Sequence, residues 1–335
     1  VGGKTVFNLS YKNLSPDYFG LGIHRHSIFQ LLHEKIKSLS IPIINRFCAS
    51  DIKNENNEYT LISKDNVRSG NYDLIIDASG ARSVIRDKYA KVHFNRPLAY
   101  GALWAVCEDE RQRIGKNILQ QRVHQAKLGI GLIPIGKKPE AASKEYIAFH
   151  WSIRNKDYDK WRNTSFAKWK NEVTNLWGLT KYLVAQFNDH SDLTWAVYND
   201  IVLKQFYTDR IVFIGDAGHS ISPRLGQGAN LGLVDALILS NVLRKYIDDI
   251  DEALALYNKA RKHHVRFYHL ASRSMSMLFQ SDSVIAPMIR DLSFGVLCKI
   301  PFTHRQMLET LGGIKTGVFS KIDPGHLHKD YGLNK

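Results

Sequence analysis

The chain has 335 residues, of which 44% are hydrophobic and 23% are charged, with 23 Gly and 9 Pro. At roughly 150 residues per domain, this length predicts about two domains. The composition is that of a globular protein and excludes disordered, collagen-like and disulfide-scaffold chains. Cys48, Cys107 and Cys298 lie far apart, without a CxxC pair or zinc-ligand spacing. We therefore expect no metal site, and reduced thiols that pack as small apolar side chains.

The formal net charge is +14, from 46 Lys and Arg against 32 Asp and Glu. Such an excess is typical of proteins that bind nucleic acids, anionic lipids or acidic ligands. The basic residues are scattered, however, and we expect a solvated, Lys-rich surface and no nucleic-acid partner. No apolar run reaches the ~18 residues of a membrane span, and VGGKTVFNLS contains no signal core. These features predict a cytoplasmic protein and leave contact with a membrane surface open.

The first third of the chain alternates between strand and helix signals. Residues 4–12 alternate like an extended strand. The stretch HSIFQLLHEKIKSL has apolar residues three and four apart, which predicts a helix from near Ser27. Further strands are predicted in PIINRFCAS, EYTLIS and YDLIIDASG, with a polar hairpin around residues 53–57.

The middle of the chain, from about Arg96 to Arg154, is strand-rich in LAYGALWAVCE, KLGIGLIPIG and EYIAFHWSIR. Residues 156–183 are predicted to be helical, and their tryptophans are spaced as core residues rather than as a ligand platform. TDRIVFIGDAGH is then predicted as a buried strand that enters a turn. It feeds a helix over 226–246 that is apolar nearly all round and therefore expected to be buried. Residues 250–320 are predicted to be mainly helical.

The turn after this buried strand carries the chemistry. Asp216 follows the strand at its carboxyl end, where open α/β sheets place their ligands. Gly226 and Gly228 precede the next helix, where a ligand can approach the backbone and unpaired N–H groups favour an anionic group. Asp216 would accept hydrogen bonds from ribose-like or ribityl hydroxyls. In the alternative, Asp216 is only a cap or turn residue and the glycines only form tight turns.

Residues 211–236 resemble the second FAD-binding motif of the flavin-dependent aromatic hydroxylases. These single-component monooxygenases are built like p-hydroxybenzoate hydroxylase, and their motif has the form GDAAHxxxPxxGQGxNxxxxDA. The matching positions are Gly215, Asp216, Ala217, His219, Pro223, Gly226, Gln227, Gly228, Asn230, Asp235 and Ala236, whereas Gly218 stands where Ala is usual. The resemblance implies that Asp216 binds the ribityl chain. The other cofactor-binding residues that it implies here are Gly215, Pro223, Gly226, Gln227, Gly228, Ala229 and Asn230, with helix-start N–H groups facing the electron-rich edge of the ring.

Two further stretches resemble this family. DLIIDASGARSVIR is similar to DLxxGADGxxSxVR, which implies that Ser79 and Gly80 lie near the FAD pyrophosphate, although Ser79 stands where the family has Asp. An ordinary strand-turn-helix crossover explains this stretch equally well. GLGIHRHSIFQLL is similar to GxxIxRxxLxxxL, which implies that Arg25 binds near the ribose and phosphates, with His24 and His26 as bystanders.

The opening strand and GxGxxG turn of the family, which hold the ADP half of FAD, are not found in this sequence. The first residues already correspond to the stretch that follows that unit in the family. We therefore expect that ~30 or more residues of the family pattern are not represented. On that basis the 335-residue chain alone is expected to bind FAD weakly.

The resemblance implies an α/β fold, α+β overall. A three-layer Rossmann-like FAD-binding domain would comprise residues 1–95 and 207–335, the latter with C-terminal helices, interleaved with a β-sheet substrate domain over 96–206. Trp104, His150 and Trp151 are candidates for lining a substrate pocket because they are bulky residues on strands, with plain sheet packing as the alternative. No catalytic side chain is assigned, because a flavin hydroperoxide is the oxidant in this family.

The activity that the resemblance implies is hydroxylation of an aromatic or similarly unsaturated small molecule by an FAD-dependent monooxygenase, with O2 and NAD(P)H as co-substrates. A ubiquinone-pathway hydroxylase, an antibiotic-inactivating monooxygenase and a reductase of the same fold remain open, and the missing WxWxIP string disfavours a halogenase. The alternative from another class is a non-catalytic remnant of the fold that acts as a basic binding module for anionic membranes or polyanions. The sequence leaves open the substrate, the choice of NADH or NADPH and the oligomeric state.

Overall fold

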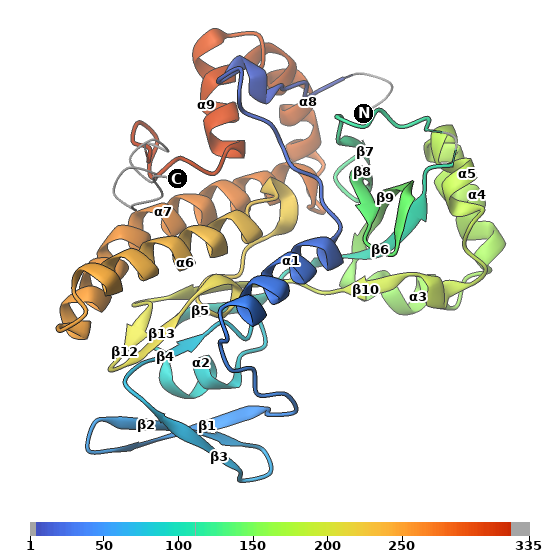
Figure 1. The fold of residues 1–335 in the computed structure, drawn as a ribbon. Helices are drawn as coiled ribbons and strands as arrows, with labels where there is room; N and C mark the ends of the chain where they lie inside the picture. Colours follow the sequence, from blue (N-terminus) through green and yellow to red (C-terminus); the bar gives the residue numbers. More distant parts are fainter. Residues whose placement is uncertain (1–4, 111, 323–335) are drawn as a thin grey trace. The chain divides into compact units, whose positions relative to one another are not determined.

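The computed structural model describes residues 5–110 and 112–322 (Figure 1). Helices and strands are mixed along the chain, which confirms the predicted α/β class. The chain forms two compact units, which we describe separately. Unit 1 comprises Val1–Ile43, Ala99–Val197 and Met277–His304, and unit 2 comprises Ile44–Leu98, Tyr198–Ser276 and Arg305–Lys335. These bounds differ from the expected segments, in that residues 1–43 and 277–304 group with the middle of the chain.

Unit 1 is built on a five-stranded antiparallel sheet of order β10-β6-β9-β8-β7. Its strands are β6 (Tyr100–Glu108), β7 (Gln120–His124), β8 (Leu128–Lys138), β9 (Ala141–Arg154) and β10 (Thr194–Ala196). Its helices are α1 (Arg25–Ser38), α3 (Tyr158–Arg162), α4 (Phe166–Leu176), α5 (Lys181–Val184) and α8 (Ile285–Leu297), and α9 (Pro301–Leu311) begins in it.

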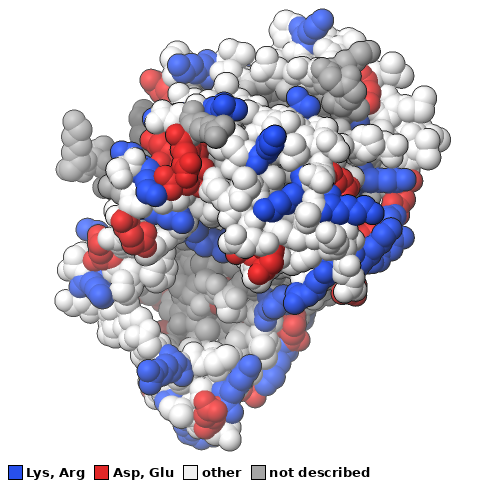
Figure 2. All heavy atoms as spheres, turned by 90° about the vertical axis from the view of Figure 1, so that its right-hand side faces the viewer, with Lys and Arg blue, Asp and Glu red and all other residues white. Residues whose placement is uncertain are grey.

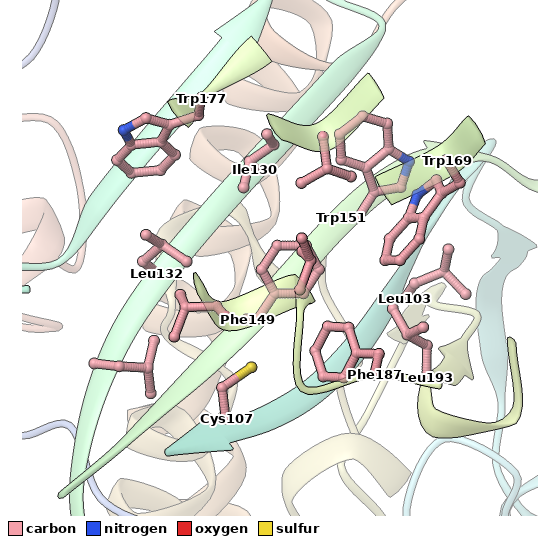
Figure 3. Packing of buried hydrophobic residues seen from close by; sticks show 14 of the residues in the cluster. Leu103, Cys107, Ile130, Leu132, Phe149, Trp151, Trp169, Trp177, Phe187 and Leu193 are labelled. Atoms are coloured by element: carbon pink, nitrogen blue, oxygen red, sulfur yellow. The ribbon is translucent and has the colours of Figure 1, made fainter. Parts of the chain in front are cut away.

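The core of unit 1 forms where α3, α4 and α5 pack their apolar residues against this sheet (Figure 3). Trp161, Trp169 and Trp177 are all buried in it, as their spacing predicts. The predicted helix over 156–183 is nevertheless broken into three pieces, with interruptions at Asn163–Ser165 and around Gly178.

Unit 2 contains a three-stranded sheet of order β12-β13-β4, in which β13 (Ile211–Phe213) runs parallel to β4 (Ile75–Asp77) and antiparallel to β12 (Tyr207–Thr208). Two long helices, α6 (Gly228–Lys245) and α7 (Ile250–Phe279), run side by side and pack with this sheet and with α2 (Val84–Tyr89) in one core (Figure 1). The remaining strands are β1 (Ala49–Glu55), β2 (Glu58–Ser63) and β3 (Arg68–Tyr72), which form a separate sheet, and β5 (Val92–Pro97), which pairs with β11 (Asn199–Leu203).

Four expectations about the elements are wrong. The described part of 4–12 pairs with no described strand, and Phe7 packs instead on Phe294 of α8, while Lys4 lies outside the described residues. The strand predicted at 42–50 starts only at Ala49, because Pro42 has no N–H to donate and Arg46 is left-handed with φ 59°.

Helix α6 is buried along one face only, and Leu233 is 64% exposed. Cys48 is exposed, whereas Cys107 is buried as expected.

The surface carries charges of both signs. Figure 2 shows Lys and Arg side chains over one face of the molecule, with Asp and Glu among them. Within residues 5–110 and 112–322, no helix combines the length and apolarity needed to cross a membrane.

Candidate functional site

The parallel pair β4 and β13 brings two of the predicted loops together in unit 2. Asp77 and Phe213 are register partners at the carboxyl ends of these strands, and the N–H of Ile214 donates to the Asp77 carbonyl at 3.0 Å. The loops that follow therefore leave the sheet at the same edge, where parallel sheets bind ligands. One carries Ser79 and Gly80, and the other carries Gly215 and Asp216.

A buried carboxylate shapes the first loop. Oδ1 of Asp77 accepts hydrogen bonds from the Ser79 N–H at 2.9 Å and from the Ser79 hydroxyl at 2.6 Å, while Oδ2 accepts from the Ser83 hydroxyl. Gly80 has φ 92°, and a Cβ there would meet nothing within 4 Å. Hydrogen bonds to Asp77 thus hold this loop in place, and the space next to Gly80 is free of protein atoms. The sequence reasoning missed Asp77, although an acidic residue that directly ends the apolar run LII was a signal for it.

The second loop presents Asp216 to solvent. Gly215 is left-handed, with φ 56°, and a Cβ on Gly232 of α6 would lie 3.4 Å from the Gly215 Cα, so the turn and the helix touch through glycines. Asp216 is exposed, and within the described part of the chain no hydrogen bond to its carboxylate is found. Desolvation by the surrounding protein raises the pKa of Asp216, and His219 partly offsets this. The carboxylate is therefore available to hydroxyl donors of a ligand.

Asp235 of α6 anchors this turn from behind. Its Oδ2 accepts the Gly215 N–H at 2.7 Å and contacts His219 Nε2 at 2.5 Å, while Oδ1 accepts from Arg261 Nε at 2.6 Å. Burial alone would raise the pKa of Asp235, but His219, Arg261 and the Gly215 N–H outweigh it and hold the pKa below its usual value. Asp235 is therefore an ionised, fully partnered carboxylate in the protein interior.

The third loop opens α6. Pro223–Leu225 forms a single 3-10 turn, Gly226 is left-handed with φ 64°, and α6 starts at Gly228. The first N–H groups of a helix have no acceptor within the helix, and here Gln227 makes no side-chain cap and no acidic residue lies in the first turn. The Gln227 side chain instead donates to the Leu311 carbonyl at 2.7 Å and accepts from Asn230 Nδ2 at 3.1 Å. What this loop offers a ligand is therefore backbone N–H groups and a positive helix end.

The remaining predicted residues lie in unit 1. Arg25 is the exposed first residue of α1, and His24 caps that helix by accepting the His26 N–H at 3.2 Å. Trp104 and His150 are register partners on β6 and β9, and their ring centroids are 4.9 Å apart.

Trp151, the third predicted pocket residue, lies in the core of unit 1. It points to the opposite face from His150, is 1% exposed and packs edge-on against Trp169, with 6.3 Å between ring centroids (Figure 3). It is a core residue, because neighbouring side chains on a strand alternate between the two faces of the sheet.

The donor set of unit 2 fits a flavin nucleotide. An exposed carboxylate suits the ribityl hydroxyls, and an acid-free helix start suits the negative edge of a reduced ring. Left-handed glycines at 80, 215 and 226 allow close approach to the backbone, and a Cβ at Gly80 or Gly226 would meet nothing within 4 Å.

Comparison with known proteins agrees with this geometry. Residues 53–268 match the family described as FAD binding domain, and the chain belongs to this family. A flavin-dependent monooxygenase from an unknown prokaryotic organism is 26% identical over 242 residues, which cover 69% of this chain and 59% of that protein. The 3-amino-4-hydroxybenzoate 2-monooxygenase PtnB3 of Streptomyces platensis is 31% identical over 129 residues, or 38% of this chain and 30% of that protein.

Solved structures share the fold. Klebsiella pneumoniae HpxO in complex with FAD and uric acid superposes with a TM-score of 0.67 at 19% identity, over 86% of this chain and 72% of HpxO. The 2-methyl-3-hydroxypyridine-5-carboxylic acid oxygenase gives 0.65 at 15% identity, over 86% of this chain and 71% of the oxygenase. Of the two curated relatives named in the preceding paragraph, by contrast, the chain spans less than two thirds of the length.

Proposed function

We propose that this chain provides the flavin-binding and substrate-binding parts of an FAD-dependent monooxygenase that hydroxylates an aromatic or similarly unsaturated small molecule with O2 and NAD(P)H. One observation carries the proposal. In unit 2, the exposed Asp216 follows β13 at the carboxyl edge of the β4–β13 pair, and the glycine-lined start of α6 belongs to the same unit. The relatives are monooxygenases, which supports an enzyme over a basic binding module.

Bound FAD would supply the redox chemistry, and the residues of this chain would bind and orient it. Asp216 would accept hydrogen bonds from the ribityl hydroxyls. Ser79 and Gly80 would offer a loop whose shape Asp77 fixes. The assignment of Arg25 to ribose and phosphate stays a prediction of the sequence resemblance. The N–H groups that open α6 would stabilise negative charge on the bound flavin, because they are held in place before that charge develops.

FAD titration tests the cofactor assignment. The 335-residue chain is titrated with FAD, and binding is followed by flavin fluorescence. Asp216→Ala should raise the Kd by about 10 to 100-fold, the effect of losing charge-assisted hydrogen bonds. Asp248→Ala, an exposed acidic residue in the turn after α6, is the matched control and should leave the Kd unchanged. Equal Kd values for Asp216→Ala and the unaltered protein would refute the assignment.

Turnover tests the reaction. The FAD-loaded protein should oxidise NADH or NADPH faster in the presence of a hydroxylatable phenol or N-heterocycle, and the product should carry one oxygen atom from 18O2. NAD(P)H oxidation that no aromatic compound stimulates would refute the monooxygenase assignment while leaving FAD binding intact.

A further inference from the structure

A buried series of polar contacts in unit 2 joins the turn at Gly215 to Gly313, near the end of the described chain. Asp235 accepts hydrogen bonds from the Gly215 N–H at 2.7 Å and from Arg261 Nε at 2.6 Å. Arg261 Nη1 in turn contacts His264 Nδ1, and His264 Nε2 lies 2.9 Å from the Gly313 carbonyl oxygen. Asp235, Arg261 and His264 are all 0% exposed. The contacts therefore form without competition from water.

The direction of these bonds fixes the state of His264. A guanidinium only donates and a carbonyl oxygen only accepts, so Nδ1 carries no proton and Nε2 carries one. Burial, together with the charge of Arg261, lowers the pKa of His264 to about 3, in agreement with a neutral ring. The neutral His264 ring thus links Arg261 of α7 to Gly313 by hydrogen bonds.

Gly313 lies in a turn formed by residues 310–315, which we call the C-terminal turn. This turn also contacts Gln227, the residue that precedes α6. Gly313 is left-handed, with φ 79°, and a Cβ there would lie 2.6 Å from Gln227 Oε1. Gln227 Nε2 donates to the Leu311 carbonyl at 2.7 Å, and Asn230 Nδ2 donates to Gln227 Oε1 at 3.1 Å. Only glycine at 313 leaves room for this arrangement.

The C-terminal turn is itself held firmly. The Tyr268 hydroxyl donates to the Thr310 carbonyl at 2.9 Å and accepts from the Lys315 N–H at 3.3 Å. The carboxylate of Glu309, which is 4% exposed, pairs with Lys321 Nζ at 2.8 Å. These contacts hold the turn in a fixed position against α7. The Leu311 carbonyl, which accepts from Gln227, is therefore held in place as well.

We propose that Gln227, His264 and Gly313 are positioning residues, through which the C-terminal turn fixes the two cofactor-facing turns, at Gly215 and at the start of α6. The inference rests on the proposed function in that these turns bind FAD. The C-terminal turn would act by holding these two turns in place, because donors that stabilise developing charge must be held in position beforehand, and neighbouring contacts supply that rigidity. A merely structural role would predict loss of stability with no specific effect on the α6 start.

Two variants test this. Gly313→Ala places a methyl group against Gln227, and Tyr268→Phe removes the donor to Thr310 without adding bulk. Tyr268→Phe keeps the test available should Gly313→Ala not fold. Gly295→Ala in α8 is the matched glycine control, because a Cβ there would meet nothing within 4 Å. Leu203→Val, a truncation of a buried residue in β11, controls for general destabilisation of unit 2.

The first measurement is amide hydrogen exchange in the cofactor-free protein. Both variants should speed exchange in residues 226–231 by about tenfold, corresponding to about 1.4 kcal/mol of lost local protection, with no such change in either control. The second measurement is the FAD Kd, which should rise by about tenfold in both variants and stay within twofold in the controls.

Unchanged exchange in 226–231 in Gly313→Ala and Tyr268→Phe would overturn the inference, whatever FAD does. A Kd that rises no more than in Leu203→Val would also overturn it, because the contacts would then be merely structural. Faster exchange in a protein that binds no FAD would support the coupling and would refute the proposed function instead.

Discussion

Replacing Asp235 by Asn removes one charge from the interior and changes no volume. The carboxylate accepts hydrogen bonds from the Gly215 N–H and Arg261 Nε and contacts His219 Nε2, and an amide can offer an oxygen to only one side of this arrangement. Its NH2 group must face a donor, and Arg261 is left as a buried cation without a counter-ion. Breaking a buried pair in this way costs about 3–5 kcal/mol. We therefore expect the free energy of unfolding of unit 2 to fall by about that amount.

The choice of probe follows from the structure. All six tryptophans lie between residues 104 and 195, within unit 1, so that tryptophan fluorescence does not report directly on the surroundings of Asp235. Urea unfolding should instead be followed by far-ultraviolet circular dichroism, which detects α6 and α7. Asp251→Asn is the control, because that carboxylate is 71% exposed in its pair with Arg210, and its loss should cost no more than about 1 kcal/mol. The reasoning fails if Asp235→Asn costs as little as this control.

Three further outcomes are expected. The pKa of His264 falls from its ordinary 6.5 to about 3 on folding, so only the unfolded chain takes up this proton between those values. Stability should thus fall by about 1.4 kcal/mol per pH unit on acidification there, and His264→Gln should flatten that dependence in urea midpoints; equal slopes would refute it. Trp169→Ala should cost about 3–5 kcal/mol, because a 1% exposed ring leaves a cavity, and a loss below 1 kcal/mol in chemical unfolding would contradict this packing. A thiol reagent at pH 8 should label exposed Cys48 before Cys107, whose pKa burial raises to about 12, and the reverse order by mass spectrometry would show that the burial is wrong.

The candidate site was largely readable from sequence where its residues are contiguous. The string from Gly215 to Asn230 carries its own turn and helix-start signals, and the structure places its glycines in left-handed turns at 215 and 226. Asp77 and the C-terminal turn at Gly313 were not predicted, because they act through hydrogen bonds to residues far away in the chain. The polar strands β3 and β7 were missed for a related reason, since each lies at the edge of its sheet and lacks the alternation of a buried strand.

By itself the sequence determined the family, the strand-to-helix turn with Asp216 and its glycines, and the helical spacing of the tryptophans at 161, 169 and 177, because each of these depends on local spacing. Tertiary structure alone decided which face of β9 is covered, and so made Trp151 a core residue and left His150 beside Trp104. It also decided that Phe7 packs on a helix rather than in a sheet and that α6 buries only one face. The physical reason is the same in each case: periodicity says which side chains share a face, whereas burial depends on what packs against that face.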